Sequence, residues 1–330
     1  MNKRMIRKKV KTLCAVLLTA VALSALKPVA SFAAYSYQNA NKYTAGDAEI
    51  KKPVKNLDVD WISGKVSIEY HRGSTVELHE SSKKKLSDDM RLRWWLDGDT
   101  LRVRFAKPGL RQLTIRDKEL TITLPEDSAF GKVSIAAVSG DLFVPSLQTD
   151  SLKLDVISGD IKASAEAKTV AVETTSGDLD LHLNGKTKDV KIDTISGTVE
   201  VELETADRFT AESVSGEIGV KAKSIGEFEA SAGSGDISAE IGKMKRAAIS
   251  TTSGEVKVGT ERFDALTISS TSGDVRADLP EKPGFTAKLK VTSGEIGYDL
   301  PLKKEGKTFV CGDGSGELSI STTSGDITLK

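Results

Sequence analysis

The sequence is poor in the residues that usually supply cross-links and catalytic groups. Its 330 residues include two cysteines, three histidines and 5% aromatic residues. Cys14 lies in an N-terminal segment that we expect to be removed, and Cys311 alone cannot form an intramolecular disulfide. Stability must therefore come from burial and backbone pairing. The low aromatic content also argues against a sugar-processing groove, because such grooves usually use aromatic platforms.

Catalytic motifs are equally scarce. His71, His79 and His182 are far apart in the sequence, and the Cys/His spacing of a zinc site does not occur. There is no G-x-S-x-G nucleophile elbow. The segment GDGSGE (312–317) lacks the lysine of a phosphate-binding loop and is interpreted as a glycine-rich corner. The sequence therefore predicts no catalytic residue and no cofactor-binding residue.

The first 33 residues have the organisation of a secretory signal peptide. Six basic residues precede an uncharged, mostly apolar run from Leu13 to Leu26, and the small residues of SFA precede Ala34. This order predicts cleavage after Ala33 and export to the cell envelope or the extracellular space. The run of 14 residues is shorter than the ~20 that a membrane-spanning helix needs, so an uncleaved membrane anchor is the alternative.

Removal of this segment makes the chain acidic. The remaining residues include 40 basic and 47 acidic side chains, and residues 131–330 alone include 23 basic and 32 acidic ones. Nucleic acid is excluded as a partner on this ground, because phosphate binding needs a basic surface. A cell-wall polymer or another envelope protein is the expected class of partner.

A Ser-Gly pair followed by a polar or acidic residue recurs along the chain. The pair occurs twelve times, and from Gly140 to Gly273 its glycines are 18–20 residues apart. Such a fixed period is typical of a stacked repeat architecture. The glycines that we assign to structural corners are Gly140, Gly159, Gly177, Gly197, Gly216, Gly235, Gly254, Gly273, Gly294 and Gly325.

Apolar residues alternate with polar ones on both sides of each corner. They stand six and four residues before the serine, and two and four residues after the glycine. A period of two predicts a strand on each side. Glycine supplies the positive φ of the corner, and the serine and the carboxylate bond nearby backbone amides. Each coil then consists of strand, corner, strand and a loop of about six residues, and the serines are turn residues rather than nucleophiles.

These strands must pair with the coils above and below. The expected fold is all-β: a parallel β-solenoid (β-helix) of about ten 19-residue coils, right-handed and about 45–50 Å long. An antiparallel meander sandwich is the alternative, although it would not need so constant a spacing. The predicted divisions are a signal peptide (1–33), a linker (34–53), an N-terminal β cap (54–130) and the solenoid (131–330).

All three tryptophans precede the periodic region. Trp61, Trp94 and Trp95 lie in the predicted cap, which would protect the exposed strand edges at the end of the stack. We expect them to form the core of the cap. Glycan stacking by Trp94 or Trp95 is the alternative, because adjacent strand residues point to opposite faces.

The segment LTITLPEDSAFGKVSIAAVSGDLFV (120–144), the TxSGD-hydrophobic repeats and the closing STTSGDITLK together resemble a known family. This is the putative-adhesin domain family of Gram-positive bacteria, which includes the LiaG-like envelope proteins. The resemblance covers about residues 54–330. It implies a β-solenoid at the cell envelope and little about chemistry, because fold alone does not define function.

Two functions of different class follow. The first is a non-catalytic envelope protein, an adhesin or an envelope-stress scaffold, and the second is a polysaccharide-cleaving β-helix enzyme, either a lyase or a glycoside hydrolase. A groove holding an aromatic residue beside two carboxylates and a basic residue would favour the enzyme. A smooth polar rod would favour the non-catalytic protein, which we expect.

One outward row of carboxylates stands out. Three residues before the repeated serine, in-register stacking would place four acidic side chains about 5 Å apart. A solvated face is the simpler interpretation, because neighbouring charges at that spacing repel by only ~0.8 kcal/mol in water. Bound Ca²⁺ is the alternative, since it accepts oxygen ligands in irregular geometry. The row consists of Asp155, Glu173, Asp193 and Glu212.

Overall fold

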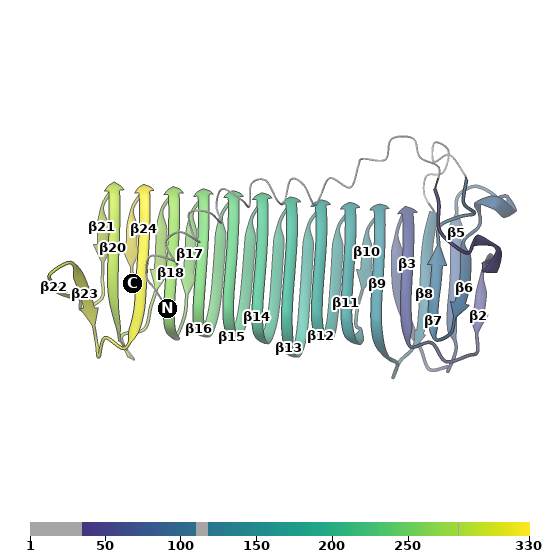
Figure 1. Cartoon of the computed structure of the whole chain (residues 1–330), viewed down its shortest axis with the longest axis horizontal. Helices are drawn as coiled ribbons and strands as arrows, with labels where there is room; N and C mark the ends of the chain where they lie inside the picture. Colours follow the sequence, from purple (N-terminus) through teal and green to yellow (C-terminus); the bar gives the residue numbers. More distant parts are fainter. Residues whose placement is uncertain (1–34, 110–117, 283) are drawn as a thin grey trace.

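The protein is a long stack of β-coils (Figure 1). The computed structural model describes residues 35–109, 118–282 and 284–330. The predicted signal peptide lies outside the described residues. Within the described residues, no helix is long and apolar enough to cross a membrane. The helices described are two single 3₁₀ turns, η1 (Ala40–Lys42) and η2 (Asp88–Met90).

The middle of the stack follows the order of the sequence. Each strand pairs in parallel and in register with the same strand of the next coil, so that Val190 lies between Val170 and Phe209. Parallel pairing confirms the long parallel strands and rules out the antiparallel meander sandwich. The strands are β9 (Ala129–Ser139), β10 (Leu142–Val144), β11 (Gln148–Ser158), β12 (Ile161–Ser176), β13 (Leu179–Ser196), β14 (Val199–Ser215), β15 (Ile218–Ser234), β16 (Ile237–Ser253), β17 (Val256–Gly259), β18 (Arg262–Ser272) and β19 (Val275–Asp278).

The expected loop of about six residues is wrong for the central coils. Strands β12 to β16 run through the whole coil without interruption, because neighbouring coils bend at the same place and the ladder continues across the bend. Ile225 lies inside this bend and is fully buried. Between β10 and β11, and between β17 and β18, the strand does break.

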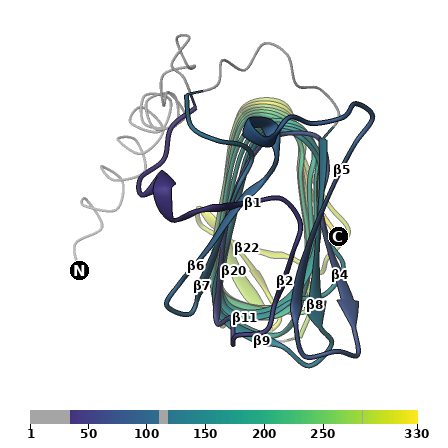
Figure 2. The same ribbon diagram turned by 90° about the vertical axis from the view of Figure 1, so that its right-hand side faces the viewer.

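Figure 2 shows the coils end on, with two long sides that enclose the core. The predicted inward positions are buried: Leu181, which follows the corner at Gly177, and Val190 and Ile192, which precede the corner at Gly197, have no exposed surface. A third inward position, two residues before the serine, was not predicted because it is often polar. Thr194 occupies it with 1% exposure, and its hydroxyl donates to the carbonyl of Ser196 at 3.1 Å. Local bonding of this kind lets a hydroxyl be buried at little cost.

The corner glycines are required by close approach of one coil to the next. At eight of the ten predicted corners φ lies between 111° and 148°. In addition, a Cβ built on any of the ten would lie well under 3.0 Å from the carbonyl oxygen of the neighbouring corner glycine. Gly140 and Gly216 are outside the left-handed region but have the same close approach. Glycine is therefore needed for space at every corner and for conformation at most of them.

The polar corner side chains bond between coils rather than within one turn. The carboxylate of Asp160 accepts a hydrogen bond from the backbone N–H of Asp178, one coil further on, at 2.9 Å. The hydroxyl of Ser196 donates to the carbonyl of Thr175 in the preceding coil at 3.2 Å. The expected bonding to local amides is thus corrected: these side chains reinforce the stacking.

The N-terminal end contains a coil that the period does not reveal. β3 and β4 flank Ser63 and Gly64, and they pair in parallel with β9 and β10, so residues 56–71 continue the stack. The outermost coil is formed by β7 and β8, which come later in the sequence and pair with β3 and β4. These strands are β3 (Asn56–Ser63), β4 (Val66–His71), β7 (Thr100–Arg104) and β8 (Lys118–Pro125).

Antiparallel strands then cover this end. β5 pairs with β8, β6 with β7, β2 with β5 and β1 with β6. The predicted linker (34–53) is therefore wrong in part, because it contributes β1 and β2, and part of the predicted cap belongs to the stack. The covering strands are β1 (Thr44–Ala45), β2 (Ala48–Ile50), β5 (Val76–Ser82) and β6 (Arg93–Asp97).

The C-terminal end is also out of sequence order. β24 pairs with β18 on one side and β20 on the other, so the coil of Gly325 lies between those of Gly273 and Gly294 (Figure 1). The regular spacing predicts that the coil of Gly325 is the last in the stack. The prediction fails because the sequence of a corner does not specify which corner lies next to it. The strands are β20 (Phe285–Ser293), β21 (Ile296–Tyr298), β22 (Lys303–Glu305), β23 (Thr308–Cys311), β24 (Gly316–Ser324) and β25 (Ile327–Leu329).

A buried ion pair fixes the N-terminal end to the stack. The Lys118 ammonium lies 2.5 Å from the Glu80 carboxylate, and neither side chain is more than 2% exposed. Burial lowers the pKa of Lys118 to about 8 and raises the pKa of Glu80. Trp61 is fully buried beside them and donates to the carbonyl of Lys118 at 3.2 Å. Trp94 and Trp95 are half-buried.

The first prediction concerns the corner backbone. Gly235→Val should destabilise the protein by at least about 1–3 kcal/mol, because valine tolerates positive φ badly and its Cβ would meet the carbonyl of Gly216. Gly259→Val is the control, since a Cβ there has no neighbour within 4 Å, and it should change stability by less than about 0.5 kcal/mol. Equal denaturation curves for the two variants would contradict this role of the corner.

Candidate functional site

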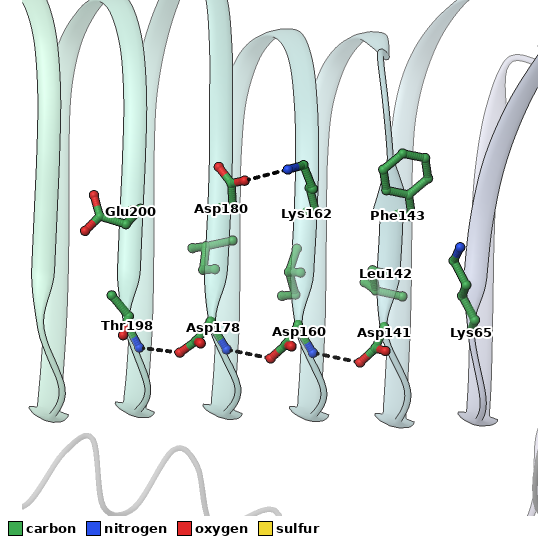
Figure 3. A pocket seen from close by; sticks show the side chains of 12 residues that line it. Lys65, Asp141, Leu142, Phe143, Asp160, Lys162, Asp178, Asp180, Thr198 and Glu200 are labelled. Carbon is green, nitrogen blue, oxygen red and sulfur yellow. Dashed lines mark hydrogen bonds and ion pairs between the residues drawn. The ribbon is translucent and has the colours of Figure 1, made fainter.

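A shallow groove of ≈ 690 Å³ crosses the strands that follow the corners. Phe143, Lys162, Asp180 and Glu200 stand side by side on β10, β12, β13 and β14, because their strands are paired in register (Figure 3). Lys65 closes the N-terminal end, with its ammonium 5.3 Å from the centroid of the Phe143 ring. A half-buried aromatic ring therefore lies among charged side chains.

The corner aspartates form the lower border of this groove (Figure 3). Oδ1 of Asp141 accepts from the N–H of Asp160 at 3.0 Å, and Oδ1 of Asp178 accepts from the N–H of Thr198 at 2.8 Å. These bonds fix one oxygen of each carboxylate toward the next coil. The second oxygen of each carboxylate takes no part in these bonds, and each of these side chains is exposed.

The remaining charges of the groove are largely paired. The Lys162 ammonium lies 3.1 Å from the Asp180 carboxylate, and His182 contacts the same carboxylate at 3.2 Å. Glu200 is exposed at the other end. An aromatic ring thus stands beside several carboxylates and two lysines, which is the composition that we set as favouring an enzyme. Most of these carboxylates are nevertheless committed to backbone amides or to a lysine.

The predicted row of four carboxylates is present as a column. Asp155 pairs with Glu173, Glu173 with Asp193, and Asp193 with Glu212 across successive coils. Burial and the neighbouring Asp193 raise the pKa of Glu212.

Two lysines partly neutralise this column. The Lys153 ammonium lies 3.5 Å from Glu173 and 3.9 Å from Asp155, and Lys191 donates to the carboxylate of Asp193. Among the described residues, no group of three or more His, Cys, Asp or Glu side chains is arranged to hold a metal ion.

The other sequence candidates are distributed over the molecule. His71 contacts the carbonyl of Thr75, and His79 contacts Asp47, so the histidines do not share one site. Trp95 packs edge-on against Tyr43 in the N-terminal end, with the Lys42 ammonium 4.7 Å from its ring centroid. Glycan stacking by Trp94 or Trp95 stays a prediction.

Sequence reasoning missed the groove because its members come from separate parts of the chain. Lys65 follows a corner outside the periodic region, and Phe143 stands at a position that is polar or small in most coils. The signal that could have found it is the Ser63-Gly64 pair, which has the same form as the later corners.

Comparison with known proteins identifies a family. The family model described as Toastrack DUF4097 matches residues 54–264 and 241–330. No curated protein matches the sequence. The family match therefore covers the parallel stack from β3 to β25.

Distant similarities to solved structures extend over most of the chain. A putative cell adhesion protein from Clostridium sporogenes ATCC 15579 is 12% identical over 87% of this chain and 99% of its own, with a TM-score of 0.23. A putative adhesin from Bacteroides fragilis NCTC 9343 is 13% identical over 87% and 97%, with a TM-score of 0.38. A putative adhesin from Parabacteroides distasonis ATCC 8503 is 17% identical over 86% and 97%, with a TM-score of 0.39.

Calcium binding by the carboxylate column stays a prediction. If the column holds Ca²⁺, millimolar Ca²⁺ should raise the melting temperature, because a ligand that binds the folded state stabilises it. Asp193→Asn combined with Glu173→Gln should abolish the rise. Glu240→Gln combined with Asp264→Asn removes two exposed carboxylates elsewhere and should preserve it. The same calcium response in all three proteins would rule out this column as the site.

Proposed function

The chain belongs to the Toastrack DUF4097 family, and we propose that this member is an exported, non-catalytic protein of the cell envelope. Its stack serves as a rigid surface for adhesion or for holding envelope components together. Export rests on the organisation of residues 1–33. The partner is a cell-wall polymer, bound along the groove between Lys65 and Glu200.

The observation that carries this proposal is that most carboxylates of the groove are held in place by backbone amides or by a lysine. Asp141, Asp160 and Asp178 each accept a backbone N–H of the next coil, and Asp180 is paired with Lys162. Carboxylates held in this way are fixed hydrogen-bonding groups, well suited to polar groups of a polymer. Phe143 supplies an apolar ring on which a sugar face can lie. The groove is open and shallow, so a long chain can bind without threading.

A second candidate is the polysaccharide-cleaving enzyme. The observation that favours it is the pair of carboxylates, Asp180 and Glu200, which lie on adjacent strands of the groove that also contains Phe143. Glycoside hydrolysis needs two carboxylates that flank the bond to be cleaved. Asp180 already contacts Lys162 and His182, so we favour binding without cleavage.

Binding and cleavage can be measured on the same samples. Purified protein should sediment with insoluble cell-wall polymer, and Phe143→Ala should weaken binding about tenfold, or ~1.4 kcal/mol, through loss of the ring. Tyr298→Ala is the matched control, because Tyr298 is an exposed aromatic residue at the far end of the stack, and it should bind as the wild type does.

The outcome also separates the two functions. Release of soluble fragments that Glu200→Gln abolishes would favour the enzyme. Sedimentation that Phe143→Ala and Tyr298→Ala leave equally unchanged would remove the groove as the binding site.

Export is tested separately from binding. We expect the protein in the envelope or extracellular fraction with a mature N-terminus at Ala34, because the small residues of SFA precede it. N-terminal sequencing of the fractionated protein is the measurement. An intact N-terminus in the membrane fraction would show that the segment is an anchor.

A further inference from the structure

An exposed apolar row runs along the rim of the stack, on the other side of the corners from the groove. Val138, Ile157 and Val214 each stand directly before a corner serine and are 39%, 49% and 39% exposed. They account for three of the four exposed large apolar side chains in the described part of the chain. The neighbouring residues Val156 and Ala137 are register partners, as are Ser158 and Ser139, so the row follows the stack axis. We call this the rim row: Val138, Ile157, Thr175, Ile195 and Val214.

Carboxylates border the rim row on both sides. The column of Asp155, Glu173, Asp193 and Glu212 lies two residues earlier on the same strand face, about 6.6 Å away at ~3.3 Å per residue. On the other side lie the corner carboxylates, three residues after the rim row. They are Asp141, Asp160, Asp178 and Glu217. Eight carboxylates therefore flank one apolar stripe.

The rim row and the column of Asp155, Glu173, Asp193 and Glu212 end at the same coil, whereas the corner carboxylates continue as far as Asp326. After Val214, the rim position is occupied by Gly233, Thr252 and Thr271. After Glu212, the carboxylate position is occupied by Ser231, Ser250 and Ser269, which are its register partners. The fold is the same in both halves, so stacking does not require the apolar or the acidic residues. The rim row is apolar except at Thr175, and an exposed apolar row with polar borders is typical of an interaction surface.

We propose that this surface binds a cationic amphipathic helix lying along the stack axis. The apolar side of the helix would contact the rim row, and its lysines or arginines would reach the carboxylates on both borders. Coils repeat every ~4.8 Å and helix turns every ~5.4 Å, so each turn meets about one coil. From Val138 to Val214 the row spans four coil spacings, or ~19 Å, which matches three to four turns. This site lies on the other side of the corners from the groove and shares the corner aspartates with it, but it does not depend on the proposed function.

The charge balance supports a cationic partner. Lys153 and Lys191 neutralise part of the carboxylate column, while Asp141, Asp160 and Asp178 of the corners accept hydrogen bonds from backbone amides. Lys65 takes the corner position at the N-terminal limit of the surface, next to Gly64, where the carboxylates end. An acidic or neutral helix would bury these carboxylates without adding a countercharge, which buried carboxylates need.

The test uses the purified full-length chain and a labelled 18-residue helix of leucine and lysine with one apolar side. The wild-type protein should bind it, and 500 mM salt should weaken binding relative to 50 mM, since salt screens exposed charges. A peptide of the same composition in scrambled order and a peptide with glutamate in place of lysine should each bind at least tenfold more weakly.

Two triple variants convert the surface into that of the C-terminal half. Ile157→Thr, Ile195→Thr and Val214→Thr remove three of the four apolar residues of the rim row, and Glu173→Ser, Asp193→Ser and Glu212→Ser remove three of the four carboxylates of the column. Each should weaken helix binding at least tenfold while the melting temperature stays close to wild type, because Thr252, Thr271, Ser250 and Ser269 occupy the same positions in other coils. Thr252→Ser with Thr271→Ser is the control and should bind as the wild type does.

Three results would overturn the proposal. The first is equal affinity of the triple variants and the wild type for the helix. The second is equal binding of the ordered and the scrambled peptide. The third is binding of phosphatidylcholine vesicles, but not of the helix, that the threonine variant abolishes, because the rim would then be a lipid-contacting surface.

Discussion

The whole stack depends on one contact between main chains, in which the Cα of a corner glycine faces the carbonyl oxygen of the neighbouring corner glycine. No side chain fits into this contact, so each coil must turn at the same height as its neighbour. Once the corners superpose, the parallel ladders on both sides fall into register. A periodic sequence thereby becomes a set of straight columns, such as the stacked Phe209 and Phe228 in the core.

The same ladder leaves an open edge at each end of the stack, and the two ends are covered in a similar way. At each end a coil adjacent in the sequence is not adjacent in space: β7 and β8 lie outside β3 and β4, and β24 lies inside β20. Antiparallel strands then cover the outermost coil. At the C-terminal end β23 covers residues 285–287 of β20. The rest of β20 presents Lys288 and Lys290, and charges on an edge strand discourage pairing with another sheet.

The parts of the fold that follow from the corner constraint could be predicted from sequence, and the rest could not. The inward positions, the parallel stacking and the column through Asp155 and Glu212 all follow once the register is fixed. The corner at Gly64 could not be recognised from the period, because an insertion that contains β5 to β8 separates it from Gly140. The position of the Gly325 coil could not be predicted, because all corners have a similar backbone and any two of them could stack. The groove combines Lys65 and Phe143 from either side of that insertion, so its composition could not be read from the period.

Because the corner and the inward columns satisfy folding, the outward columns are free to differ from coil to coil. Thr252 takes the same place in its coil as Ile157 does in another, with the same strand pairing around it. Ile157 gains less from folding than a core isoleucine does, since its side chain is 49% exposed. The block of apolar and acidic residues between Gly140 and Gly216 therefore needs a cause other than fold stability. The groove and the rim row both lie on these coils and share the corner aspartates. The N-terminal half of the stack therefore carries both surfaces suited to binding, and the C-terminal half lengthens the stack.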